Sequence, residues 1–278
     1  MTAPWHRLLL APLLVTLLLL LGSQAVFLHA SFYRDLGYGL QADTPSLANY
    51  ARMLGDPFYL GVLWTSVILS AAASAWTVGL GFPTAYLLAR ARSRWAPAML
   101  ALILLSAFVT IAIKIYGLMI IFAGNGVLNR TLIALGLTSG PVTLIGTRLG
   151  VVVGLSYFSF GFAVMLLYSV VRTIPRSLEE AAAVHGAGRV RTLWRVVLPL
   201  CLPGLATAFL TVFNLCMGAF TSAALLGAGR VLTLPVLIQR TILGEVRYGL
   251  GGALAALLML SVLALNLLSA AIVRRRPT

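Results

Sequence analysis

The chain has 278 residues, of which 60% are hydrophobic and 9% are charged, with a mean hydropathy of +1.01. Soluble domains carry about 25% charged residues, so this composition excludes a water-soluble protein. The formal net charge is +14, but the basic residues flank apolar runs and form no stripe with interleaved aromatic residues. This distribution argues against binding of nucleic acid.

Six apolar segments predict six membrane-spanning helices, because each reaches the length of about 20 residues that a transmembrane helix needs. The expected spans are residues 8–27, 60–89, 96–123, 144–171, 201–226 and 249–273. The first segment is long for the apolar region of a signal peptide, and further spans follow it. We therefore expect it to remain as an uncleaved helix.

Arginine residues mark one side of the membrane. They lie before the first span at Arg7, and they gather in segments 90–94, 172–195 and 274–276. The segments on the opposite side contain more widely spaced arginines mixed with acidic residues. The excess of positive charge on cytoplasmic loops then places both termini in the cytoplasm. The predicted fold class is an all-α membrane protein with six transmembrane helices.

The residues needed for familiar catalytic chemistry are missing from the sequence. There is no G-x-x-x-x-G-K-[ST] phosphate loop, no histidine pair with zinc-ligand spacing, and no serine with a histidine at the same depth. Cys201 and Cys216 also lack the spacing of metal ligands. We therefore predict no catalytic residue and no metal site.

The six acidic residues all lie in connecting segments. Carriers driven by protons or sodium usually place carboxylates inside the bilayer. If this protein moves a solute, the energy is therefore expected to come from a partner.

The stretch "SLEEAAAVHGAGRVRTLWRVVLPL", residues 177–200, interrupts the apolar sequence with charges and is named the bracket below. Ser177 and Glu180 have the spacing of a capping box, which predicts a helix start at Ser177. Gly186 and Gly188 should end that helix, and a second helical piece should lead to Pro199. The pattern predicts a helix-turn-helix on the cytoplasmic face. An ordinary charged loop is the alternative, and composition alone favours it.

A spaced motif within the bracket resembles a known family. Glu180-Ala181-Ala182, Gly186 and Val196-x-Leu198-Pro199 are similar to the E-A-A-x3-G-x9-I-x-L-P signature of ABC-transporter permeases that work with a solute-binding protein, with Val in place of Ile at 196. The segments "GLGFPTAYLLAR", "GNGVLNRTLIALGL" and "ALLGAGRVLTLPVLI" resemble the spermidine/putrescine branch of these permeases.

The resemblance implies that the bracket docks on a cytoplasmic ATPase and transmits its motion to the helices. The implied ATPase-coupling residues are Glu179, Glu180, Ala181, Ala182, Gly186, Leu198 and Pro199. ATP would be bound by the partner ATPase subunits, so this chain would hold no cofactor of its own. The other implied partners are a second permease subunit, giving a heterodimer, a periplasmic solute-binding protein and the lipid of the bacterial inner membrane.

The implied organisation has three parts. Residues 1–59 would form the first helix and a periplasmic segment, residues 60–273 a permease core with its coupling segment at 173–200, and residues 274–278 a basic cytoplasmic tail. The solute is left open among polyamine-like, amino-acid-like and phosphonate-like compounds. The third span has Lys114-Ile115-Tyr116-Gly117-Leu118 where the polyamine branch often has Arg-x-Tyr-x-Trp.

Four polar residues on apolar helices are candidates for lining the translocation path: Lys114, Tyr116, Tyr157 and Asn214. Charged residues inside a membrane are often functional, whereas polar residues also serve as hydrogen-bonding contacts between helices. Both interpretations stay open here. The alternative function is a polytopic scaffold or membrane enzyme that needs no ATPase partner.

Overall fold

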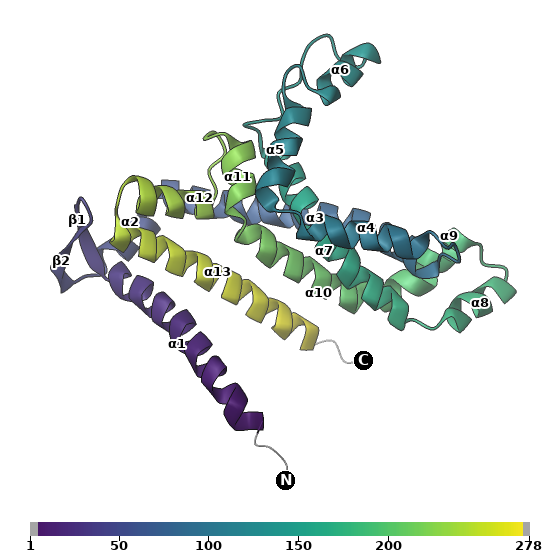
Figure 1. Ribbon diagram of the computed structural model, residues 1–278, viewed down its shortest axis with the longest axis horizontal. Coiled ribbons are helices and arrows are strands. Elements are labelled where there is room, and N and C mark those ends of the chain that lie inside the picture. The colour runs from purple at the N-terminus through teal and green to yellow at the C-terminus, as the bar shows by residue number, and fades with distance from the viewer. Residues whose placement is uncertain (1–4, 275–278) are drawn as a thin grey trace. The chain divides into compact units, whose positions relative to one another are not determined.

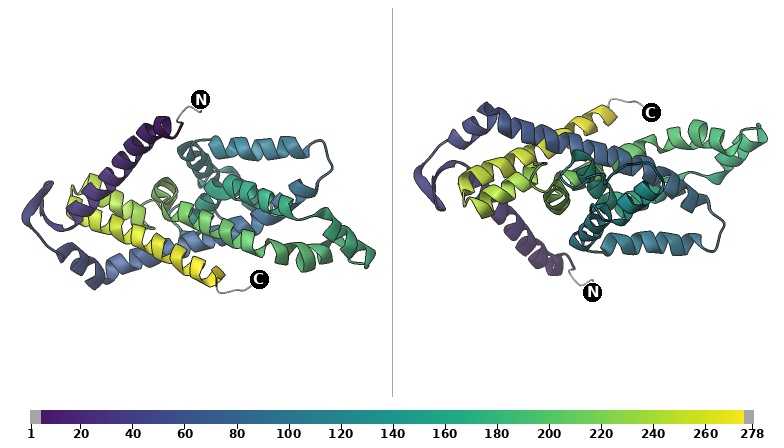
Figure 2. Two further views of the ribbon diagram at one scale, coloured as in Figure 1. Left: turned by 90° about the horizontal axis from the view of Figure 1, so that it is seen from below. Right: turned by 90° about the horizontal axis from the view of Figure 1, so that it is seen from above.

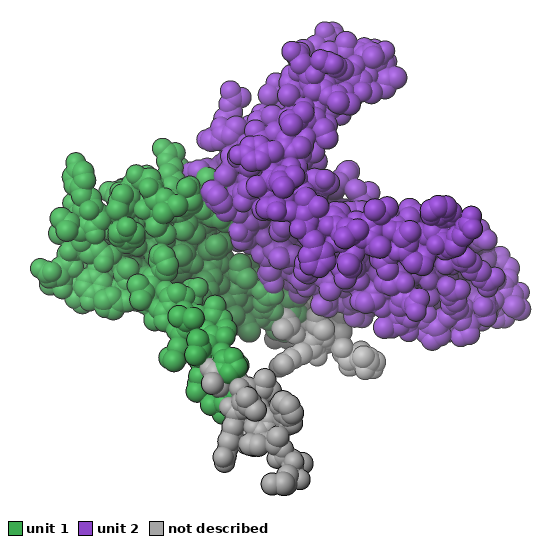
Figure 3. Space-filling view, in the orientation of Figure 1, with its two compact units in different colours: residues 1–63, 234–278 green, residues 64–233 purple. Residues whose placement is uncertain are grey.

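The computed structural model describes residues 5–274, which form helices and one two-stranded hairpin (Figure 1). Two compact units are distinguished in Figure 3, one of residues 1–63 and 234–278 and the other of residues 64–233. Six helical stretches are long and apolar enough to cross a membrane, which confirms the predicted number. They are Pro12–Ser31, Pro57–Arg90, Ile111–Ala134, Arg148–Thr173, Arg189–Met217 and Tyr248–Ser269.

The first unit is built around the pair of helices α1 and α13. Its elements are α1 (Trp5–Ser31), β1 (Tyr33–Gly37), β2 (Leu40–Pro45), α2 (Ala48–Gly55), α12 (Leu234–Gln239), the π-helical turn η2 (Arg240–Gly244) and α13 (Tyr248–Arg274). Helix α1 packs along α13. The strands are antiparallel, with Asp35 opposite Gln41. The hairpin was not expected from the sequence, which predicts helices and connecting segments in this region.

The second unit is built around α7 (Arg148–Thr173), which packs against α4, α10 and α11. Its elements are the greater part of α3 (Pro57–Arg90), then α4 (Ala96–Phe108), α5 (Ile111–Phe122), α6 (Val127–Ala134), α7, α8 (Arg176–Val184), α9 (Arg189–Thr192), the π-helical turn η1 (Leu193–Val197), α10 (Leu198–Met217) and α11 (Phe220–Gly227). One buried apolar cluster joins α3, α7 and α10, with Phe82, Leu167 and Cys201 among its members.

Two of the predicted spans are interrupted. The stretch 96–123 was expected as one helix, but Val109 and Thr110 have extended backbones and separate α4 from α5. The stretch 201–226 breaks after α10 at Gly218 and Ala219. Hydropathy measures how favourably a segment enters lipid, and it does not show where a helix is interrupted. Neither break could therefore be located from the apolar composition of these segments.

The bracket has the predicted helix-turn-helix form, but the predicted capping box is wrong. Helix α8 begins at Arg176 with Pro175 at the N-cap position, and no side chain caps its first turn. Ser177 lies one residue inside the helix, and Glu180 is exposed. The residue after an extended Pro175 is already helical, so Ser177 is no longer at the boundary where its hydroxyl could serve as a cap.

Candidate functional site

The turn of the bracket is closed by backbone hydrogen bonds around Gly186. Gly186 has a left-handed φ of +79°, its N–H donates to the carbonyl of Ala183 at 2.9 Å, and the N–H of Ala187 donates to Ala182 at 3.0 Å. This pair of bonds is the Schellman pattern, which favours glycine at the left-handed position. The prediction that Gly186 ends the first helix of the bracket is confirmed.

Pro199 accounts for the wide helical turn that leads out of the bracket. A proline inside a helix cannot donate a backbone hydrogen bond, and its ring clashes with the carbonyl four residues earlier. In the preceding turn η1, the N–H of Leu198 bonds to the carbonyl of Leu193, five residues back. This π-type turn continues without a break into α10. Figures 1 and 2 show α8 and α9 together at one end of the α7–α10 pair.

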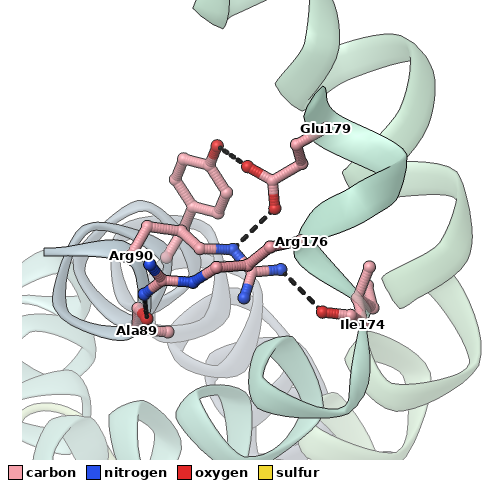
Figure 4. Close-up of polar contacts among 6 residues, drawn as sticks. Ala89, Arg90, Ile174, Arg176 and Glu179 are labelled. Atoms are coloured by element: carbon pink, nitrogen blue, oxygen red, sulfur yellow. Dashed lines mark hydrogen bonds and ion pairs between the residues drawn. The ribbon is translucent and has the colours of Figure 1, made fainter. Parts of the chain in front are cut away.

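A polar junction joins α8 to the last turn of α3 (Figure 4). One carboxylate oxygen of Glu179 accepts a hydrogen bond from Arg90 Nε at 2.6 Å, and the other accepts from the Tyr86 hydroxyl at 2.9 Å. Tyr86 and Arg90 are four residues apart, so they project from the same face of α3. The side chains of Arg90 and Glu179 are only 13% and 18% exposed, so water screens this ion pair weakly.

Two arginines cross between the ends of neighbouring helices at the same place. Arg90, the last residue of α3, donates to the carbonyl of Ile174, which caps the end of α7, at 3.0 Å. Arg176, which follows α7, donates to the carbonyl of Ala89 in the last turn of α3 at 3.2 Å. The last carbonyls of a helix lack partners within the helix and carry partial negative charge that favours nearby cations. At the ends of both α3 and α7, a backbone carbonyl therefore has an arginine as its hydrogen-bond partner.

The structure divides the predicted coupling residues into two groups. Glu180, Ala181, Gly186 and Pro199 are exposed, whereas Glu179 is partly buried and bonded to α3. The remaining two, Ala182 and Leu198, are half-buried. Large apolar side chains are also exposed on the bracket, namely Val184 at 85%, Val190 at 71% and Trp194 at 64%. An exposed apolar group bordered by charges is typical of a surface that contacts another protein or a membrane.

Tyr86 and Arg90 are site residues that the sequence analysis did not single out. Both lie inside "GLGFPTAYLLAR", the segment that resembles the polyamine branch. A tyrosine and an arginine four apart at the end of a span could have indicated a polar contact, but the sequence does not indicate Glu179 as their partner.

The structure brings together two of the four candidates for the translocation path. Lys114 on α5 is 6% exposed, and its Nζ lies 5.9 Å from the centre of the Tyr157 ring on α7, within the range of a cation–π contact. Tyr116, two residues after Lys114 on α5, is 56% exposed. Asn214 lies partly buried on α10.

Hydroxyl groups connect α3 to α7 within the second unit. Ser156 on α7 donates to the carbonyl of Ala73 at 3.3 Å, and the hydroxyls of Ser159 and Thr77 lie 3.4 Å apart. These contacts agree with polar residues that join helices inside a membrane. Among the residues whose side chains the structure describes, no group of three or more His, Cys, Asp or Glu could hold a metal ion.

Residues 78–276 match the family described as the binding-protein-dependent transport system inner membrane component. The chain belongs to this family. The spermidine/putrescine transport system permease protein PotB of Haemophilus influenzae is 31% identical over 228 residues, which are 82% of this chain and 79% of that protein. The family match at residues 78–276 includes the bracket and the end of α3, so the motifs and the family agree.

Two solved transporters have the same fold. A bacterial alginate ABC transporter in complex with an alginate pentasaccharide-bound periplasmic protein has a TM-score of 0.81 at 18% identity, covering 98% of this chain and 94% of that chain. The MetNI methionine ABC transporter in an inward-facing conformation has a TM-score of 0.59 at 22% identity, covering 77% of this chain and 94% of that chain.

Membership of the family establishes the function at the level of the subunit. The chain is a multi-pass permease subunit of an ABC importer in the bacterial inner membrane. It does not catalyse ATP hydrolysis itself, because in this family the partner ATPase does so. This result excludes the alternative of a scaffold or membrane enzyme that works without an ATPase.

Proposed function

We propose that the bracket is the surface through which this permease receives the motion of its ATPase. The exposed residues Glu180, Ala181 and Gly186 would face the ATPase, and Leu198 and Pro199 would lead the motion into α10. The observation that carries this proposal is the orientation of α8. Its inner face is bonded to α3 through Glu179, while its outer face is exposed.

Small side chains make the outer face of α8 suitable for close contact. Ala181 and Ala182 are followed by the turn at Gly186, which has a left-handed backbone. A Cβ added at Gly186 would meet no atom within 4 Å. A partner can therefore approach the backbone of this turn without displacing a side chain. The exposed Val184 beside the turn would supply apolar area to the contact.

The proposed assembly contains a second permease subunit, forming a heterodimer with this chain, together with two ATPase copies and a periplasmic solute-binding protein. Both termini and the bracket would lie in the cytoplasm, as the arginine distribution predicts. Residues 1–59, 60–273 and 274–278 would be the first helix with its periplasmic segment, the permease core and a basic tail. Transport requires the loaded binding protein and ATP to favour the same conformation of the permease pair.

The proposed solute is small and polyamine-like, with amino-acid-like and phosphonate-like compounds as the other classes. The name of the PotB relative, which refers to spermidine and putrescine, supports the first class. Lys114, Tyr116, Tyr157 and Asn214 remain the proposed lining of the path. A cation at Lys114 would repel a polycation, so Lys114 would have a gating or structural role, or the solute would be anionic, rather than Lys114 contacting a polyamine directly.

A pull-down from native membranes in mild detergent tests the docking surface. The tagged chain should recover ATPase subunits, and Gly186→Trp should lose them because the indole would fill the space at the turn. Gly188→Trp is a control for bulk near the turn, since a Cβ at Gly188 also meets no atom within 4 Å, and Gly186→Ala is the control for the strain that any side chain meets at a φ of +79°. Equal recovery of the ATPase by wild type and Gly186→Trp would overturn the proposed docking site.

A further inference from the structure

Two adjacent glutamates of the bracket have different surroundings. Neighbouring residues on a helix point about 100° apart, so Glu179 faces α3 while Glu180 is exposed. Both oxygens of the Glu179 carboxylate are occupied, one by Arg90 and one by Tyr86. Glu179 is therefore committed to a contact inside this chain, although it belongs to the same acidic pair as the residue proposed to face the ATPase.

We propose that Tyr86 and Arg90 are positioning residues for energy coupling. Through Glu179 they fix α8 to α3, so that α3 moves together with the bracket when the ATPase closes. The bracket is joined through the backbone to α7 and α10, and this junction adds α3 as a third helix. The inference rests on the proposed function, because it assumes that the ATPase moves the bracket.

The connections at both ends of α8 explain why such a junction is needed. Before α8, Ile174 and Pro175 are extended, with ψ of 122° and 134°. After it, the chain turns at Gly186 and Gly188. Residues at the ends of an element can absorb changes of backbone angle, so backbone continuity alone would transmit only part of a displacement of α8. Arg90 restrains the first link directly, because it also bonds the Ile174 carbonyl.

The junction has the geometry of a strong polar contact. A charge-assisted hydrogen bond is shorter and stronger than one between neutral groups, and the 2.6 Å separation of Arg90 Nε and Glu179 has this character. The use of both carboxylate oxygens also limits rotation of the Glu179 side chain. In the turns of α3 that precede the junction, Phe82 and Ala85 lie in the buried cluster with Leu167 and Cys201. A displacement at Arg90 would therefore be carried along α3 by packed side chains.

A distance measurement in the assembled complex tests the inference without knowledge of the solute. Nitroxide labels are placed at Leu80→Cys on α3 and Ser177→Cys on α8, because both positions are exposed. The native Cys201 and Cys216 are buried and remain in place. Pulsed electron paramagnetic resonance then measures the distance between the labels in complexes that have co-purified with the ATPase, before and after trapping with ATP and vanadate.

The inference predicts the same single distance before and after trapping, because α3 and α8 move together. Arg90→Gln and Glu179→Gln should give a broadened or shifted distance after trapping, because α8 then moves without α3. Tyr86→Phe should give a smaller change, since it removes one of the two contacts to the carboxylate. Arg92→Gln is the control, because Arg92 is exposed and lies just beyond α3.

A charge exchange separates positioning from a general loss of folding. Arg90→Glu with Glu179→Arg should restore a single distance in part, because the exchanged pair still joins α3 to α8 but cannot donate to the Ile174 carbonyl. A distance that changes on trapping in the unmodified background would overturn the inference, as would single variants that behave like Arg92→Gln. Failure of the complex to co-purify with an ATPase would instead overturn the proposed function.

Discussion

Asp35 and Gly249 lie 214 positions apart in the sequence, and their contact joins the N-terminal and C-terminal segments of the first unit. The carboxylate of Asp35 accepts hydrogen bonds from the backbone N–H groups of Gly249 and Leu250, each at 2.8 Å. These N–H groups belong to the first turn of α13, where they have no partner within the helix. A Cβ at position 249 would meet the carbonyl oxygen of Tyr33, so glycine lets the strand approach this closely.

Replacing Asp35 should therefore destabilise the first unit. Asp35→Ala removes a helix cap, which costs about 1 to 2 kcal/mol of unfolding free energy. Thermal unfolding of the purified chain in detergent measures this effect as a lower midpoint temperature. Asp43→Ala is the matched control, since Asp43 lies exposed on the same hairpin. Equal midpoints for the two variants would show that the Asp35 contact adds nothing to stability.

The number of spans and the form of the bracket could be predicted from the sequence because each depends on local signals. Apolar length alone identifies a membrane helix, and a glycine such as Gly186 marks the end of a helix through its own backbone freedom. The break at Val109 and Thr110 could not be predicted, since the apolar sequence continues across it. The Asp35–Gly249 contact also has no local signal, because its partners are distant in the sequence.

The candidate site was predicted by motif, and its internal arrangement was not. The bracket motif begins at Glu180, and its spacing does not show whether Glu180 or the adjacent Glu179 faces inward. That difference is seen in the contacts of Glu179 with Tyr86 and Arg90 of α3, which lie 93 and 89 residues earlier in the sequence. Arg90 was missed for a related reason, since arginines at span ends are expected from membrane topology alone. Its role became visible only through its contacts with Glu179 and Ile174.

The left-handed backbone at Gly186 predicts a local effect of replacing it. Gly186→Ala should weaken the end of α8 by about 1 kcal/mol, because a Cβ disfavours a φ of +79°. The amides of Gly186 and Ala187 should then exchange with deuterium about five times faster, if local opening governs their exchange. Gly186→Asn should show less change, since asparagine tolerates this conformation. Gly188→Ala serves as the control because Gly188 has a φ of −67°, and a similar rate increase there would contradict the argument.

The contact between α7 and α10 predicts that Gly204 cannot carry a larger side chain without cost. A Cβ at Gly204 would meet the side chain of Val170, with Cγ2 at 2.7 Å. Gly204→Ala should therefore destabilise the chain by about 1 to 3 kcal/mol through overpacking, seen as a lower midpoint of thermal unfolding. Gly79→Ala on α3 is the control, because a Cβ there meets no atom within 4 Å. Its higher helix propensity should make it neutral or slightly stabilising, and equal losses in both variants would contradict the packing argument.

The burial of Lys114 predicts a gain in stability when its charge is removed. Neither of the two ion pairs formed by the described residues includes Lys114, and the ring of Tyr157 is the aromatic group beside its ammonium. A buried charge without an opposite charge is costly, whereas a cation–π contact returns only about 0.5 to 2 kcal/mol. Lys114→Met should therefore raise the midpoint of thermal unfolding, while Lys114→Arg, which keeps the cation, should not.

The Tyr157 ring provides a second test of the same site. If the ring compensates part of the charge, Tyr157→Leu should lower the stability of wild type, yet have a smaller effect in the Lys114→Met background. A double-mutant cycle of the four chains measures that difference directly. Additive effects would show that the ring and the ammonium do not interact. A lower midpoint of thermal unfolding for Lys114→Met would show that Lys114 stabilises the fold. Stability alone would then explain why a lysine is buried here, without a role in gating.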